Sequence, residues 1–195
     1  MRRLTLAALV IGSVALFAAP AQAAADVTIK NFAFSPTPFT TTEGSSVTWQ
    51  NTDLADHTAT SDRAGFFNTG TIAAGGGQET VTIDEAGTFP YHCTFHSSMV
   101  ATVRLPIVLS SSTTSVGAGI SVIAATADAK SAFTYDYAKK LGTGSWVTFK
   151  TQVTAEQVTF TPKQAGTLHF RSRVYNSKGK PSGWSPVAKL TVVTG

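Results

Sequence analysis

The sequence is poor in charged residues and contains a single cysteine. Only 13% of its 195 residues are Asp, Glu, Lys or Arg, against about a quarter in an ordinary soluble protein, while 43% are hydrophobic. A disordered chain or a coiled coil would be far richer in charge, so this composition excludes both. Without Arg2 and Arg3, 13 Lys and Arg stand against 11 Asp and Glu, a net charge of +2. So small an excess predicts no nucleic acid or other polyanion as a partner.

Residues that favour helices are also scarce, whereas Thr, Ser and Val are abundant beside 16 Gly and 8 Pro. This composition favours strands and turns, and it predicts an all-β protein. Hydrophobic and polar residues alternate with the period of two that is typical of strands. The alternation occurs at residues 27–32, 47–51, 80–83 and 100–105, and again at 120–123, 133–137, 146–150, 158–160, 168–175 and 187–192.

Residues 1–23 have the pattern of a signal peptide. Met1-Arg2-Arg3 is basic, residues 4–19 are mostly apolar, and Ala21-Gln22-Ala23 fits a cleavage site that ends at Ala23. The apolar run is shorter than the ~20 residues of a membrane-spanning helix, and no second run occurs in the sequence. We therefore expect export to the periplasm or the extracellular space, without a membrane span.

The lone thiol, Cys93, is unusual for an exported chain, in which cysteines are normally paired. It cannot form an internal disulfide. An intermolecular disulfide, a buried inert thiol and a metal ligand remain as interpretations.

A change of composition after Pro106, where a Ser/Thr run follows at 110–115, predicts two domains at residues 24–106 and 107–195. The second has six or seven short strands over roughly 90 residues, typical of an immunoglobulin-type or fibronectin-type sandwich. Its segment 165–186, with Phe170-Arg171-Ser172-Arg173-Val174 and Gly183-Trp184-Ser185-Pro186, resembles the last strands of a fibronectin type III domain.

The chemistry lies at the end of the first domain. Alternation along the strand at 89–93 places Tyr91 and Cys93 on one face and His92 on the other. Cys93, His96 and Met99 then follow at three-residue steps, so a short loop can bring their side chains to one point. With one imidazole from a distant strand, this donor set is that of an electron-transfer copper site. His57, in the polar loop after residues 47–51, is the obvious candidate for that imidazole.

Residues 26–105 resemble the cupredoxins, most closely the amicyanin and plastocyanin group. The resemblance is carried by Val47-Thr48-Trp49-Gln50-Asn51, by His57-Thr58-Ala59 and by Tyr91-His92-Cys93-Thr94-Phe95-His96-Ser97-Ser98-Met99. It implies a Greek-key sandwich or barrel and one type 1 copper ion held by His57, Cys93, His96 and Met99. Two positions depart from the family: Asp56 stands where many relatives have Pro. Thr58 stands where many have the Asn that ties the ligand loops together.

The sequence contains no nucleophile elbow, phosphate loop or paired-carboxylate motif, so we expect no enzyme. The resemblance implies an electron carrier between transient redox protein partners, with His96, beside Phe95, as the point of electron entry. A copper-binding or copper-delivery module whose C-terminal domain docks on a protein or an envelope component is the alternative, and a structural adhesin with a degenerate site is a third. His92 and His169 are expected to lie outside the metal site.

Overall fold

The chain folds into β-strands joined by turns and loops. The computed structural model describes residues 26–126, 129–130 and 132–194, and these residues form sixteen strands and no helix. The all-β prediction is confirmed for this part of the chain. The predicted signal peptide, residues 1–23, lies outside the described residues. No helix long and apolar enough to cross a membrane occurs in the described ranges.

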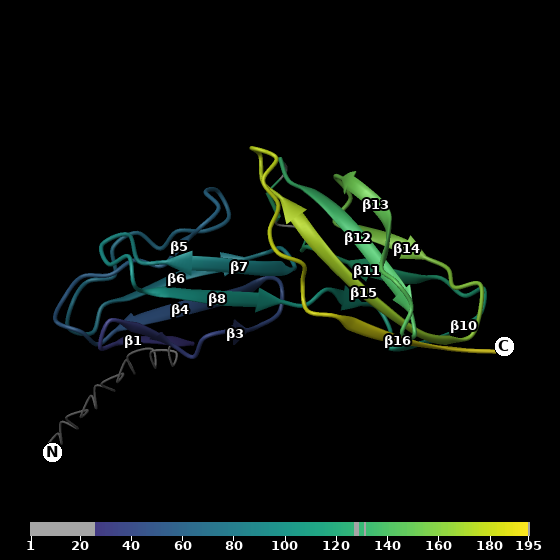
Figure 1. Ribbon diagram of the computed structural model, residues 1–195, viewed down its shortest axis with the longest axis horizontal. Coiled ribbons are helices and arrows are strands. Elements are labelled where there is room, and N and C mark those ends of the chain that lie inside the picture. Colours follow the sequence, from purple (N-terminus) through teal and green to yellow (C-terminus); the bar gives the residue numbers. More distant parts are fainter. Residues whose placement is uncertain (1–25, 127–128, 131, 195) are drawn as a thin grey trace, which may run out of the picture.

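The first half of the chain builds two four-stranded sheets, with strand orders β2-β1-β4-β6 and β3-β8-β7-β5 (Figure 1). The pairs β1/β4 and β3/β8 are parallel, and the other pairs in these sheets are antiparallel. The strands are β1 (Val27–Lys30), β2 (Ala33–Ser35), β3 (Phe39–Thr40), β4 (Ser45–Asn51), β5 (Thr60–Ser61), β6 (Gln78–Ile83), β7 (Gly87–His92) and β8 (Val100–Leu105).

The second half builds a five-stranded sheet, β10-β16-β15-β12-β13, and a three-stranded sheet, β14-β11-β9. The two halves follow one another along the longest axis of the molecule (Figure 1). The strands are β9 (Val108–Leu109), β10 (Thr113–Ser115), β11 (Ile120–Ile123), β12 (Thr134–Leu141), β13 (Val147–Val153), β14 (Gln157–Phe160), β15 (Gly166–Tyr175) and β16 (Ala188–Val193).

Alternating side chains from facing sheets form the core of each half. In the first half Trp49 of β4 is fully buried, donates a hydrogen bond from Nε1 to the Tyr91 hydroxyl on β7 (3.2 Å) and stacks on Phe67 at 5.7 Å. In the second half Phe160 of β14 meets Phe170 of β15 at 5.1 Å. The sequence also favours a core position for Phe32, Phe34, Trp49, Phe89 and Tyr91. Four of these rings are buried, but Phe32 is 51% exposed, because it lies on the turn after β1 and not on a strand that faces the core.

Every strand predicted from alternation is present, with ends that shift by up to four residues. The sequence did not predict β2, β3, β5, β9 and β10. These strands are two or three residues long, too short to show an alternating pattern.

The two halves touch through specific contacts. Phe66 of the first half lies 5.6 Å from Phe133 of the second, ring centre to ring centre. Thr88 and Gly183 exchange two backbone hydrogen bonds of 3.1 and 2.9 Å. A Cβ on Gly183 would lie 3.0 Å from Thr88, so glycine permits this close approach. The Asn176 side chain also donates to the Ala64 carbonyl at 2.8 Å. The first half is therefore held against the second by hydrogen bonds and buried rings.

Candidate metal centre

Three of the four predicted ligands meet in the first half of the chain. Cys93 Sγ lies 3.7 Å from His57 Nδ1 and 3.5 Å from His96 Nδ1, and the two Nδ1 atoms are 3.1 Å apart. His57 and Cys93 are buried and His96 is partly exposed. Within the described residues this is the one group of three or more His, Cys, Asp or Glu side chains close enough to hold a metal ion.

The spacing of the three atoms fits a single ion. The point equidistant from them lies about 2.0 Å from each, and metal bonds to imidazole nitrogen and thiolate sulfur are about 2.0–2.3 Å long. One thiolate with two imidazoles is the donor set that favours copper. These residues are therefore in position for a copper site.

Short backbone bonds hold both ligand loops. His57 and Ile72 exchange two hydrogen bonds of 3.1 and 2.7 Å, which fix the loop between β4 and β5. The loop after β7 is closed by bonds from Cys93 N to the Met99 carbonyl (3.1 Å) and from Met99 N to the His96 carbonyl (3.0 Å). Met99 is 1% exposed. The three-residue spacing of Cys93, His96 and Met99 thus forms the tight turn that the sequence predicted.

Thr58 joins the two loops and also supports the sulfur. Its backbone N–H donates to Cys93 Sγ at 3.3 Å, and its hydroxyl accepts from the Thr94 amide at 2.9 Å. The sulfur is therefore anchored by a backbone donor from the loop that carries His57. The sequence departs from the family pattern at Thr58, yet its hydroxyl ties the loops that Asn ties in relatives.

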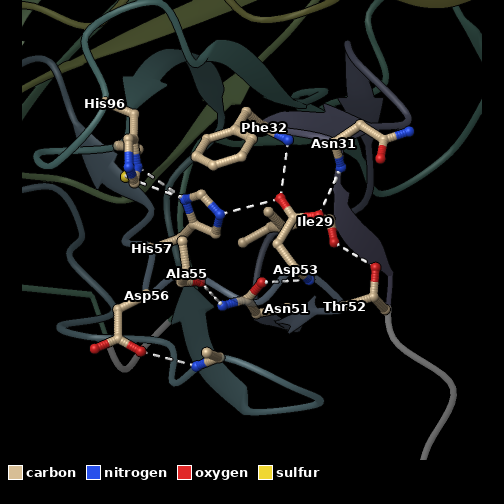
Figure 2. Close-up of polar contacts among 12 residues, drawn as sticks. Ile29, Asn31, Phe32, Asn51, Thr52, Asp53, Ala55, Asp56, His57 and His96 are labelled. Atoms are coloured by element: carbon tan, nitrogen blue, oxygen red, sulfur yellow. Dashed lines mark hydrogen bonds and ion pairs between the residues drawn. The ribbon is translucent and has the colours of Figure 1, made fainter.

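An aspartate orients the first histidine. Asp53 Oδ2 accepts from His57 Nε2 at 3.1 Å, and the same carboxylate accepts from the amides of Asn31 (2.6 Å) and Phe32 (2.8 Å) (Figure 2). Burial acts to raise the pKa of Asp53, but these amides and the imidazole outweigh it, and the pKa lies below its ordinary value. Since the ionised carboxylate can only accept, Nε2 carries the proton and Nδ1 presents its lone pair to the metal position.

The same aspartate holds an aromatic ring over the ligands. Asn31 and Phe32 form the turn between β1 and β2 with φ angles of 51° and 58°, a region that costs a bulky residue free energy. The Phe32 ring lies edge-on to both imidazoles, 5.3 Å from His57 and 4.9 Å from His96. It is 51% exposed, so it covers the ligands from the solvent side.

Asn51 fixes the loop that carries Asp53. Its buried amide group donates to the carbonyls of Ala55 (2.8 Å), Ile72 (2.9 Å) and Ala73 (3.1 Å), while its Oδ1 accepts from Asp53 N (3.0 Å). Asp56 points away from the ligands and accepts from Ala74 N at 2.9 Å (Figure 2). The loop conformation thus depends on one buried amide at the end of β4.

The other histidines lie where the sequence placed them, outside the cluster. His92 pairs with Asp62 at 2.7 Å on the side of β7 opposite to Cys93, and His169 lies on β15 in the second half. Asp53 and Asn51 were missed. Asp53 precedes His57 by four residues in a loop, and nothing in the sequence distinguishes it from Asp56.

Comparisons with known proteins found one family and several similar solved structures. The family model of the cupredoxin-like domain matches residues 3–103. Among solved structures, a purple cupredoxin from Nitrosopumilus maritimus is 25% identical over 42% of this chain and 99% of its own, with a TM-score of 0.38. The Cu(I) form of an amicyanin point mutant is 28% identical over 43% of this chain and 82% of its own, also with a TM-score of 0.38. A search of curated proteins found no match.

The fold and the ligand cluster define a β-sandwich protein with a copper site made by two histidines and one cysteine. The family match covers just over half of the chain, and the chain belongs to the cupredoxin-like family.

Proposed function

We propose that this protein is an exported type 1 copper protein that carries single electrons between redox partners and is not an enzyme. The observation that supports this proposal best is the ready-made triangle of His57, Cys93 and His96. Its three ligand atoms already have the spacing of a bound ion, so little rearrangement accompanies a change of charge at the metal. A bound copper ion supplies the one-electron couple, Cu(II)/Cu(I).

Met99 is proposed as the fourth, weak ligand. It is buried at the end of the loop that carries Cys93 and His96, and its thioether is the soft axial donor typical of such sites. Met99→Leu should keep copper bound but change the reduction potential and the visible spectrum. An unchanged potential and spectrum would exclude Met99 from the ligand set.

Electrons are proposed to pass through His96. Its imidazole is the partly exposed ligand, and it lies beside the exposed apolar rings of Phe32 (51% exposed) and Phe95 (55% exposed). Apolar, uncharged side chains around a small exposed ligand suit brief contact with a redox protein, because little desolvation of charge accompanies docking.

The burial of the ligands favours an electron carrier over a copper-delivery protein. His57 and Cys93 are 0% and 1% exposed, and Phe32 covers the imidazoles. An acceptor protein would have to displace this cover before it could take the metal. Retention of the metal is what an electron carrier requires.

The remaining organisation is also a proposal. Residues 1–23 form a signal peptide, 24–106 the copper domain, and 107–195 a fibronectin type III-like sandwich. Two observations on the second half support this assignment. It contains a five-stranded and a three-stranded sheet, and the Trp184 ring lies under the guanidinium groups of Arg171 and Arg173 on β15.

Repeated redox cycling distinguishes the two functions. Residues 24–195 loaded with copper are reduced and reoxidised several times by small inorganic reagents in the presence of a Cu(I) chelator. An electron carrier returns to its full visible absorbance in every cycle. Loss of copper to the chelator in each reduced state would contradict electron transfer and support delivery.

A further inference from the structure

One face of the five-stranded sheet in the second half carries a concentration of cations. In the β12/β15 register Ala138 pairs with Arg171 and Asp136 with Arg173, and Lys140 pairs with His169, which also pairs with Lys189 of β16. Paired residues of antiparallel strands share a face. Lys140, Arg171, Arg173 and Lys189 therefore lie on one side of three adjacent strands, which we name the basic sheet face.

Two tryptophan rings contact three of these four cations. Trp146 lies under Lys140 (5.3 Å from Nζ to the ring centre) and Arg171 (4.1 Å from Cζ). Trp184 lies under Arg171 (4.4 Å) and Arg173 (4.7 Å). A ring attracts a cation through its quadrupole but does not cancel its charge. The stack therefore fixes the guanidinium groups in place while leaving them positive.

Few negative charges balance the positive charges of the basic sheet face. The five strands of the sheet contain one acidic residue, Asp136, and its carboxylate binds Arg173 at 2.8 and 2.9 Å. In the described part of the chain Arg171 has no carboxylate partner, and its Nε is buried without a hydrogen bond. The adjacent like charges would be stabilised by an anion from outside the molecule.

Charge is also separated along the whole chain. Residues 107–195 contain ten Lys and Arg against three Asp and Glu, a net charge of +7, whereas residues 24–106 contain three against eight, a net charge of −5. The total hides this contrast because the two halves nearly cancel. Since the halves follow one another along the longest axis, the molecule has a positive end and a negative end (Figure 1).

We propose that the basic sheet face binds the surface of a membrane rich in anionic phospholipids. Its cations are spread in two dimensions over three strands, which matches a plane of phosphate groups better than a single linear polyanion. Arg pairs well with phosphate through its planar donors. An extended anionic plane would also attract the positive half and repel the negative half, and so orient the copper domain away from the membrane. The proposal does not depend on the electron-transfer function.

Vesicle binding tests the proposal. Residues 24–195, which omit the apolar leader and include every described residue, are sedimented with vesicles of phosphatidylcholine alone or mixed with phosphatidylglycerol. We expect binding only to the anionic vesicles, and its loss at 1 M salt, where the Debye length falls to about 3 Å. A basic residue at an anionic surface contributes about 1 kcal/mol, or about fivefold in affinity. Lys140→Gln with Lys189→Gln should therefore weaken binding about 25-fold.

A matched double variant controls for net charge. Lys163 and Lys178 lie outside the sheet strands in the same half, so Lys163→Gln with Lys178→Gln removes the same charge away from the face. Its binding should fall no more than a few-fold. Equal losses in the two double variants would overturn the assignment to this face. Absence of binding to anionic vesicles, or binding only to a soluble acidic polysaccharide, would overturn the membrane as its partner.

Discussion

Removal of the Asp53 carboxylate tests how the ligand loop is held. Asp53→Ala deletes three hydrogen bonds, two from backbone amides on an exposed turn and one from the fully buried His57. Water can replace the first two, at a cost of roughly 0.5–1 kcal/mol each, whereas the buried Nε2–H left unpaired costs about 1–3 kcal/mol. We expect the metal-free protein to lose about 3 kcal/mol of unfolding free energy. For a chain of this length, that loss lowers Tm by roughly 6–12 °C.

The same change should act on the copper site. The carboxylate charge lies roughly 7 Å from the centre of the ligand triangle. At an effective dielectric constant of about 20–40, its interaction with one unit of charge at that centre is about 1–2.5 kcal/mol. Loss of that negative charge stabilises Cu(I) relative to Cu(II), so the reduction potential should rise by about 50–100 mV. The amides of Asn31 and Phe32 also lose the carboxylate that accepts their hydrogen bonds, which loosens the turn over the ligands, so copper should leave the variant faster.

Asp56→Asn is the control, because it removes one acidic charge from the same loop without contact to a ligand. Calorimetry of the metal-free proteins and voltammetry of the copper-loaded ones measure both effects. We expect shifts in Asp56→Asn below about a third of those in Asp53→Ala. Equal shifts in the two variants would refute the argument that Asp53 acts through His57 and the turn.

Three further predictions concern the loops and the contact between the halves. Thr58→Val should cost about 1–2 kcal/mol in thermal unfolding, because the Thr94 amide loses its acceptor, while the Thr58 N–H to Cys93 remains; an unchanged Tm would show that the hydroxyl bond contributes nothing. Burial raises the pKa of Glu43 to about 8, so the carboxyl is neutral in the folded chain over a range in which the unfolded chain is ionised. The contribution of Glu43 to the unfolding free energy should therefore be largest near pH 4–5 and should fall by about 1–2 kcal/mol towards pH 8, after allowance for solvent screening. Urea titrations at several pH values measure this slope, and Glu43→Gln should flatten it. Phe66→Ala, at the contact with Phe133, should lower the unfolding free energy by about 3–5 kcal/mol and split urea unfolding into two transitions. One unchanged transition would mean that the halves do not stabilise each other.

The ligand loop was predictable because its information is local. Cys93, His96 and Met99 lie within seven residues, and their spacing suffices to define a turn between two strands. His57 could be assigned only because the later motif requires one more imidazole. The long strands were predictable for a similar reason, since one buried face imposes alternation over four or more residues.

The residues that support the ligands were not predictable, because their partners are distant in sequence. Asn51 bonds the carbonyl of Ile72, and Asp53 bonds the turn at Asn31, contacts that exist only after the sheets assemble. The prediction of no polyanionic partner used the net charge of the whole chain, +2 without Arg2 and Arg3. Counting each half separately gives −5 and +7, a contrast that the total does not show.

The visible absorption of the copper-loaded protein tests the central claim most directly. Addition of one equivalent of Cu(II) to residues 24–195 should produce an intense thiolate-to-copper band that saturates at one ion per chain. Cys93→Ser keeps the size of the side chain but removes the soft thiolate, and it should abolish the band and most of the thermal stabilisation by copper. A wild-type protein without an intense band, or a Cys93→Ser variant that keeps it, would contradict a copper site built on Cys93.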